Sequence, residues 1–263
     1  GVSRLVGCKG WDELAKDLVR SCFEKKIINF KEKENLEGSN NHKETITNCY
    51  YLLKNNGYLE DFFDVMQNAL SEGKNYDKKN NIYKELYHLH AVFVTTNADK
   101  VFDSFFEPKR IIHRTEDFLP DKISPDKLFH LHGLISDRNN LVFTVPQYFD
   151  RYRNENIVRF MKEIFSDKYV VLFIGYGLSE FELLDFLLLK FDKEKKDAEE
   201  KHKNFNYFVL LPFYKDEKNL TSIKRHYYNS MGIDIIPYEK DENGYNQLFF
   251  EVEKLCGELL QIS

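Results

Sequence analysis

The chain has 263 residues, enough for one large domain with a sizeable core, because compact domains usually hold about 100 to 200 residues. Its hydrophobic share of 42%, its charged share of 31% and its 23 Phe and 16 Tyr exclude a disordered chain. The formal net charge is -5, and Lys and Arg are interleaved with Asp and Glu. This pattern gives no electrostatic footprint for a polyanion, so direct nucleic-acid binding is not expected.

The cysteines and the apolar runs restrict the class further. Cys8, Cys22, Cys49 and Cys256 stand far apart and form no Cys-x-x-Cys pair, so we expect neither a zinc module nor a disulfide framework. The apolar run 170–174 is far too short to cross a bilayer. We therefore expect a cytoplasmic protein without membrane association.

The N-terminal third predicts helices. Apolar side chains recur at helical spacing over 11–28, and two further amphipathic helices are predicted at 45–53 and 58–70. A polar and charged stretch, from about 30 to 41, lies between the first helix and the helix at 45–53. Its loop is expected at 36–41. Residues from about 29 to 90 therefore form a predicted helical insert within a single domain that spans residues 1–263.

The remaining chain alternates short apolar runs with helical patterns. Several runs are apolar throughout, as strands buried on both faces of a parallel sheet are. The alternation predicts an α/β fold with a Rossmann-like parallel sheet covered by helices. The strands are predicted at 91–95, 128–131, 141–145, 169–174, 207–211 and 233–236, and the helices at 99–106, 156–165, 180–191, 218–231 and 247–260.

Polar residues and glycines collect directly after three of these strands, where ligands bind in open parallel sheets. Asn97 follows the first strand, and taken alone it suits a turn or a helix cap. His132 follows the second, and taken alone it suits a core histidine, with His130 as a competitor for any role. Gly175 and Gly177 follow the fourth predicted strand and permit either a turn or a close approach to a phosphate.

Together these motifs resemble a known family. Thr95-Thr96-Asn97-Ala98-Asp99, His130-Leu131-His132-Gly133 and Gly175-Tyr176-Gly177-Leu178-Ser179 occur in the order found in the sirtuin-like superfamily. They are most similar to its NAD hydrolases from bacterial anti-phage defence. Gly1-Val2-Ser3 matches the last three positions of that family's Gly-Ala-Gly-x-Ser loop, so we expect a first strand before Gly1.

The resemblance implies cleavage of NAD by water into nicotinamide and ADP-ribose. It implies that Asn97 positions the water and the ribose, and that His132 is the general base. Asp99 either orients the nicotinamide ribose or caps the helix predicted after it, and the cap is the favoured interpretation. By the same resemblance, Gly1 and Ser3 contact the phosphates. The adenosine side is contacted by Gly175, Gly177 and Ser179, and Thr96 and Asp99 complete the implied cofactor-binding residues.

Three alternatives stay open at this point. A nonenzymatic module would bind NAD or ADP-ribose with the same residues. A metal-dependent hydrolase would use His130-x-His132 with His113, although no metal is expected on the resemblance. An NAD-dependent protein deacylase would need the paired-cysteine zinc module that these four scattered cysteines cannot form.

The resemblance also implies partners and regulation. We expect a homo-oligomer, with a companion ATPase or a C-terminal sensor region as a further partner. A constitutive NAD hydrolase would poison its own cell, so we expect abortive-infection activity that stays silent until a trigger.

Overall fold

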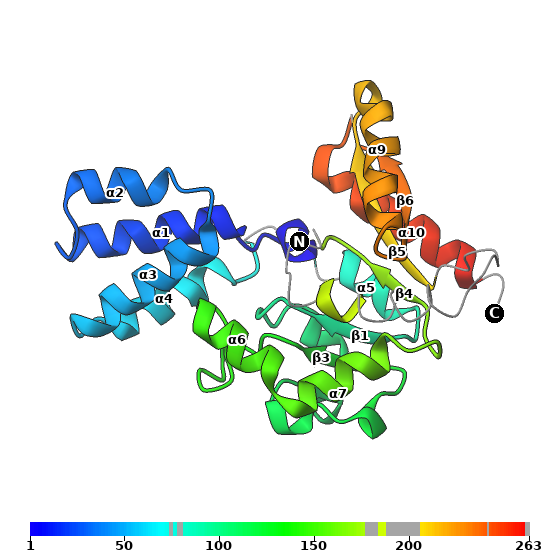
Figure 1. The fold of residues 1–263 in the computed structure, drawn as a ribbon, viewed down its shortest axis with the longest axis horizontal. Helices are drawn as coiled ribbons and strands as arrows, with labels where there is room; N and C mark the ends of the chain where they lie inside the picture. The colour runs from blue at the N-terminus through cyan, green and yellow to red at the C-terminus, as the bar shows by residue number, and fades with distance from the viewer. Residues whose placement is uncertain (74–75, 78–80, 177–183, 188–205, 241, 261–263) are drawn as a thin grey trace.

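A computed structural model describes residues 1–73, 76–77, 81–176, 184–187, 206–240 and 242–260 of the chain. Helices and parallel strands form an α/β part, and a bundle of helices lies beside it (Figure 1). Short 3₁₀ helices connect the larger elements. They are η1 (Val2–Val6), η2 (Phe102–Phe105), η3 (Pro108–Arg110), η4 (Thr115–Asp117), η5 (Pro120–Lys122), η6 (Lys215–Glu217) and η7 (Gly244–Asn246).

The strands form two three-stranded parallel sheets. One sheet has the strand order β1-β3-β2 and the other has the order β4-β5-β6. Within the described residues, β1 pairs only with β3, and β4 pairs only with β5. The confirmed class is therefore α/β with a Rossmann-like layout. The strands are β1 (Val92–Thr95), β2 (Ile111–Ile112), β3 (Lys127–His130), β4 (Val171–Phe173), β5 (Tyr207–Phe213) and β6 (Ile233–Glu239).

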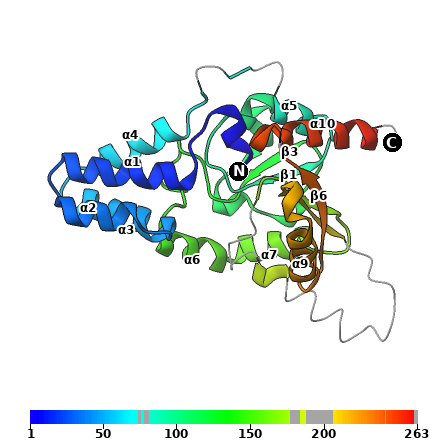
Figure 2. The same cartoon turned by 90° about the horizontal axis from the view of Figure 1, so that it is seen from above.

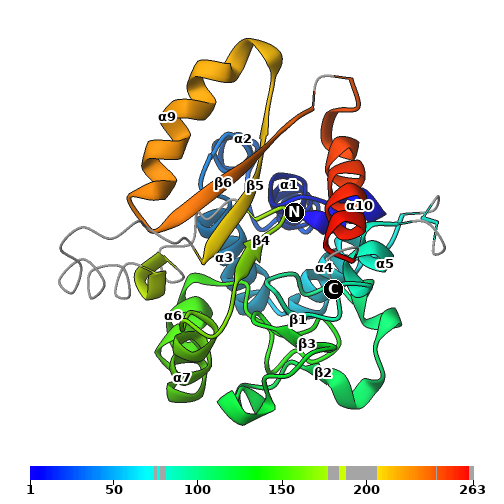
Figure 3. The same ribbon diagram turned by 90° about the vertical axis from the view of Figure 1, so that its right-hand side faces the viewer.

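Helices cover both faces of the strands. Seen from above, α7 (Glu155–Ile164) and α9 (Lys218–Asn229) lie on one side, and α5 (Ile82–Tyr87) and α10 (Gln247–Leu260) on the other (Figure 2; Figure 3). Each face has its own buried cluster of apolar side chains. None of the helices in the described ranges combines the length and the apolarity that a membrane crossing needs.

Alternation along the strands explains the two clusters. In β3, Phe129 packs with the α7 side, whereas its neighbour Leu128 packs with the α5 and α10 side. In β5, Val209 packs with the α7 side and its neighbour Leu210 packs with the α5 and α10 side. Successive side chains of a strand point to opposite faces, so an apolar run buries both faces at once.

The helical bundle has a third buried cluster. α1 (Trp11–Glu24) packs against α2 (Phe30–Glu37), α3 (His42–Asn55) and α4 (Leu59–Ala69). Ala98 belongs to the same cluster, although it lies in the loop after β1. The bundle therefore packs directly against the loop that carries the Asn97 motif.

Two of the predicted elements were wrong. Residues 141–145 form no strand, because α6 (Val145–Arg153) begins there. The Gln147 side chain accepts hydrogen bonds from the backbone N–H groups of Phe143 and Thr144, both at 2.9 Å, which fixes a helix start. The helix predicted at 99–106 is reduced to the short η2.

The helices predicted at 156–165, 218–231 and 247–260 are confirmed within a few residues by α7, α9 and α10. α2 was not predicted, because its composition is polar. It begins at a capping box in which Asn29 and Glu32 each accept a hydrogen bond from the other's backbone N–H. Of the helix predicted at 180–191, only 184–187 are described, and they are helical.

We expect Phe160→Ala to lower the free energy of unfolding by about 3 to 5 kcal/mol, because it leaves a cavity in the core. The Phe160 side chain is 0% exposed, and its ring lies 5.0 Å from that of Phe118 and 4.7 Å from that of Phe129. Urea titration followed by circular dichroism measures the change. Phe149→Ala is the control, since Phe149 is 48% exposed, and an equal loss in both variants would contradict this packing.

Candidate active site

The loop after β1 places Asn97 at the carboxyl edge of the strands. The Asn97 backbone N–H donates to Thr95 Oγ1 at 3.0 Å, which turns the chain as β1 ends. The Asn97 side-chain amide then donates to Ser3 Oγ at 2.7 Å. Residues that are far apart in the sequence are therefore joined at this edge.

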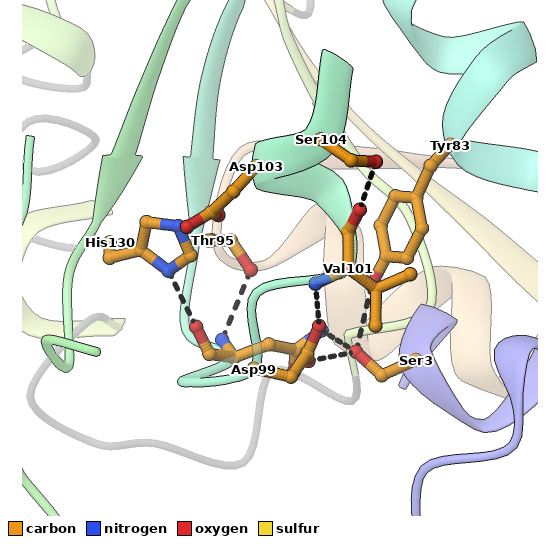
Figure 4. Close-up of polar contacts among 9 residues, drawn as sticks. Ser3, Tyr83, Thr95, Asp99, Val101, Asp103, Ser104 and His130 are labelled. Atoms are coloured by element: carbon orange, nitrogen blue, oxygen red, sulfur yellow. Dashed lines mark hydrogen bonds and ion pairs between the residues drawn. The ribbon is translucent and has the colours of Figure 1, made fainter. Parts of the chain in front are cut away.

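Ser3 is the centre of a buried polar network (Figure 4). Its hydroxyl donates to Asp99 Oδ2 at 2.5 Å and lies 2.8 Å from the Tyr83 hydroxyl. A serine hydroxyl has one proton to donate, so Ser3 accepts from both Asn97 and Tyr83. The network thereby ties η1, α5 and the loop after β1 into one unit.

Asp99 lies within this network and is only 2% exposed. Burial raises the pKa of its carboxyl, and the hydrogen bonds from Ser3 and from the Val101 backbone N–H oppose that rise. The Val101 N–H donates to Asp99 Oδ1 at 3.1 Å, so Asp99 caps the turn into η2. Both carboxylate oxygens therefore have partners within the protein.

Gly1 lies close to both Asn97 and Gly175. A methyl group added at Gly1 would lie 3.2 Å from the Gly175 carbonyl oxygen and 3.6 Å from Asn97 Oδ1. Gly175 has a φ of +61° and would bring an added methyl within 2.9 Å of Val2, so a side chain there is strained on both counts. Gly1, Asn97 and Gly175 thus meet at one point, whereas Gly177 and Ser179 lie outside the described residues.

His130, at the end of β3, holds the backbone of Asn97. Its Nδ1 lies 2.9 Å from the Asn97 carbonyl oxygen, and its Nε2 lies 2.8 Å from Asp103 Oδ1. The His130 ring is 1% exposed, so both contacts lie within the protein. His130 thereby joins the peptide of Asn97 to the carboxyl group of Asp103.

His132 contacts the neighbouring peptide. Its Nδ1 lies 3.1 Å from the Thr96 carbonyl oxygen, and its Nε2 lies 3.0 Å from the Tyr152 hydroxyl. Since the carbonyl can only accept, the neutral ring carries its proton on Nδ1 and its lone pair on Nε2 faces Tyr152. The ring is 1% exposed and packs edge-on against Tyr148 at 4.8 Å.

The structure therefore brings Gly1, Ser3, Asn97, Asp99 and Gly175 together. Thr96 contributes its carbonyl to His132, which lies next to this group with its ring in the core. That the Asn97 and His132 side chains share one nucleotide pocket stays a prediction.

Three residues of this region were not identified from the sequence. Tyr83 lies 80 positions from its partner Ser3, and no local pattern marks it. Tyr152 belongs to α6, a helix that the sequence analysis did not predict. Asp103 follows Asp99 by four positions and could have been noticed as a second carboxylate near the Asn97 motif.

The cysteines and histidines are the side chains that bear on metal binding. The four cysteines are buried and form no disulfide. Among the residues that the structure describes, no group of three or more His, Cys, Asp and Glu side chains is placed to hold a metal ion. The Nε2 atoms of His130 and His132 face different partners, Asp103 and Tyr152.

Asp99 makes stability depend on pH. The unfolded carboxyl ionises near its ordinary pKa of 3.8 while the folded one, with its raised pKa, is still protonated, so the free energy of unfolding falls as pH rises through this window. Asp99→Asn removes this contribution. We expect the stability of the variant relative to the parent to increase between pH 3.8 and neutrality, as measured by urea titration. Parallel pH profiles for the two proteins would contradict the raised pKa.

Comparisons with known proteins agree with this geometry. The family described as SIR2-like domain matches residues 91–236, which is more than half of the chain and includes the Asn97 and His132 motifs. A search of curated proteins gives no match. With parallel strands, a helical cover and these motifs at the carboxyl edge, the chain belongs to the SIR2-like domain family.

Proposed function

We propose that this chain hydrolyses NAD at the nicotinamide glycosidic bond and releases nicotinamide and ADP-ribose. Membership of the SIR2-like family indicates an activity that uses NAD. The observation that carries the finer proposal is the position of Asn97. Its amide donates to Ser3, and its oxygen lies beside Gly1, which in turn lies beside Gly175 after β4.

This position suits an attack on a ribose carbon. The transition state of glycoside cleavage has oxocarbenium character, and the departing nicotinamide needs little acid assistance. The Asn97 amide offers both a donor and an acceptor, so it can orient a water molecule against the sugar. The glycines Gly1 and Gly175 present bare backbone, which permits the close approach of a nucleotide.

His132 is the proposed general base. The Nδ1 contact with the Thr96 carbonyl leaves Nε2 as the nitrogen that accepts a proton. Because Nε2 contacts the Tyr152 hydroxyl, the proton passes through Tyr152 or follows the loss of that contact. Asp99 accepts hydrogen bonds from Ser3 and from the Val101 backbone N–H. Because both carboxylate oxygens of Asp99 already have partners, its proposed role is to orient Ser3 and to hold the turn before η2.

The buried state of His132 also supports a second candidate, a module that binds NAD or ADP-ribose and signals without turnover. Its ring is 1% exposed, and both nitrogens have contacts. Calorimetry of the assembled full-length protein with NAD, combined with product analysis, separates the two functions. Binding without nicotinamide release favours the module.

We place the proposed hydrolysis in abortive-infection defence against phage. Unregulated loss of NAD would kill the host cell, so the activity must wait for a trigger. The His132–Tyr152 contact supports a resting state in which the base is covered. A homo-oligomer, joined by a companion ATPase or a sensor region, is the assembly in which we propose that activation occurs.

We expect Asn97→Ala and His132→Ala each to abolish detectable nicotinamide release, since loss of a general base alone costs about 10² to 10⁴ in rate. Chromatography of NAD products from the assembled full-length protein measures this. The matched controls are Asn68→Ala and His226→Ala, whose side chains are exposed on α4 and α9. Circular dichroism checks that all four variants fold.

Retained turnover in either site variant would contradict its proposed role. Release of nicotinamide that needs an acylated lysine peptide would instead indicate a deacylase. Loss of activity in the exposed controls would show that the assay reports on stability rather than on the site.

A further inference from the structure

The helical bundle meets the α/β part at α6, where α3 packs against it (Figure 2). The Thr47 hydroxyl on α3 accepts a hydrogen bond from the Val145 backbone N–H at 3.0 Å. Val145 is the first residue of α6, and the first N–H groups of a helix have no partner within the helix itself. A side chain of the bundle therefore helps to fix where α6 begins.

Lys43 makes a second contact from α3 to α6. It precedes Thr47 by four positions, so both side chains lie on the same face of α3. Lys43 Nζ lies 3.9 Å from the centre of the Tyr148 ring, which is a cation–π contact. We call these four residues, Lys43 and Thr47 on α3 with Val145 and Tyr148 on α6, the junction.

Two tyrosines of α6 lead from the junction to His132. Tyr148 and Tyr152 are four positions apart, so they lie on one face of the helix. The Tyr148 ring lies edge-on against the His132 ring at 4.8 Å, and the Tyr152 hydroxyl lies 3.0 Å from His132 Nε2. A shift of α6 therefore changes both contacts of the imidazole at once.

The segment before α6 connects the bundle to the backbone of His132. Leu141 and Phe143 belong to the buried cluster of the bundle, and the Phe143 ring lies 5.3 Å from that of Trp11 on α1. Val142, between them, belongs to the cluster on the α7 side. Its backbone N–H donates to the His132 carbonyl at 2.9 Å. The bundle thus supports the peptide of His132 as well as its ring.

We propose that the helical bundle sets whether the Tyr152 hydroxyl covers Nε2 of His132, with Lys43 and Thr47 as the positioning residues. While α3 holds the start of α6, the hydroxyl stays on the ring nitrogen. A displacement of α3 breaks both junction contacts, so α6 moves and carries its tyrosines away from the ring. The inference rests on the proposed hydrolysis only in that it takes Nε2 as the base, and it makes the bundle the element through which a trigger acts.

The state of Nε2 is followed by NMR, through nitrogen chemical shifts of protein labelled at histidine. A neutral ring nitrogen that accepts a hydrogen bond differs in shift from one that accepts none. Tyr152→Phe removes the hydroxyl and gives the reference position for the uncovered nitrogen, and His132→Gln identifies the resonance. Alkaline buffer keeps the rings neutral in all variants, and no NAD is added.

We expect Lys43→Met to move the His132 Nε2 resonance towards its position in Tyr152→Phe, because methionine keeps the chain length of the side chain but lacks the cation. Lys43→Arg keeps the cation and is expected to retain the parent position. Lys54→Met is the matched control. Lys54 lies at the opposite end of α3 and makes the same kind of contact, 5.6 Å from the centre of the Tyr50 ring.

Thr47→Val tests the other junction contact. It removes the acceptor of the Val145 N–H and is expected to move the resonance in the same direction, whereas Thr47→Ser keeps the parent position. Lys43→Met combined with Tyr152→Phe is expected to give the same position as Tyr152→Phe alone, because the junction acts through that hydroxyl.

A parent-like resonance in both Lys43→Met and Thr47→Val, or an equal shift in Lys54→Met, would overturn the proposal. Circular dichroism checks each variant, and if Lys43→Met does not fold, Thr47→Val alone decides. The readout is independent of turnover. A chain that shows these shifts but releases no nicotinamide would refute the proposed hydrolysis and leave the control of His132 by the bundle intact.

Discussion

The candidate site depends on the hydroxyl group of Ser3, which makes three hydrogen bonds. It accepts from the Asn97 amide and the Tyr83 hydroxyl and donates to Asp99, all in a buried setting. Loss of such a centre leaves several buried polar groups without a partner, at a cost of about 1 to 3 kcal/mol for each. The position of Asn97 is therefore tied to the folding of η1 and α5 and not only to the end of β1.

The two histidines hold the same loop from the strand beside it. His130 binds the carbonyl of residue 97, and His132 binds the carbonyl of residue 96. His130 ends β3 and His132 lies in the turn that follows it, so both rings reach consecutive peptides of the loop after β1. His130 pairs with a carboxylate and His132 with a hydroxyl, so the first serves as an anchor and the second keeps a basic nitrogen.

Much of the fold was predictable because its signals are local. The apolar runs of β1, β3, β4, β5 and β6 predicted buried parallel strands, and helical periodicity predicted α7, α9 and α10. The prediction failed at 141–145, where a capping side chain, Gln147, outweighs an apolar run that resembles a strand. It also missed α2, whose polar composition conceals a helix that begins at an Asn29–Glu32 capping box.

The sequence by itself determined the layered α/β class, the family motifs and the position of Asn97 and His132 after strands, because periodicity and motif spacing are properties of neighbouring residues. The tertiary structure alone decided which groups meet. Tyr83 reaches Ser3 across 80 positions, and Asn97 reaches it across 94. The partner of a buried polar group is set by which segments pack together, and no local pattern encodes that choice. The burial of His132 against Tyr152 arises from packing in the same way.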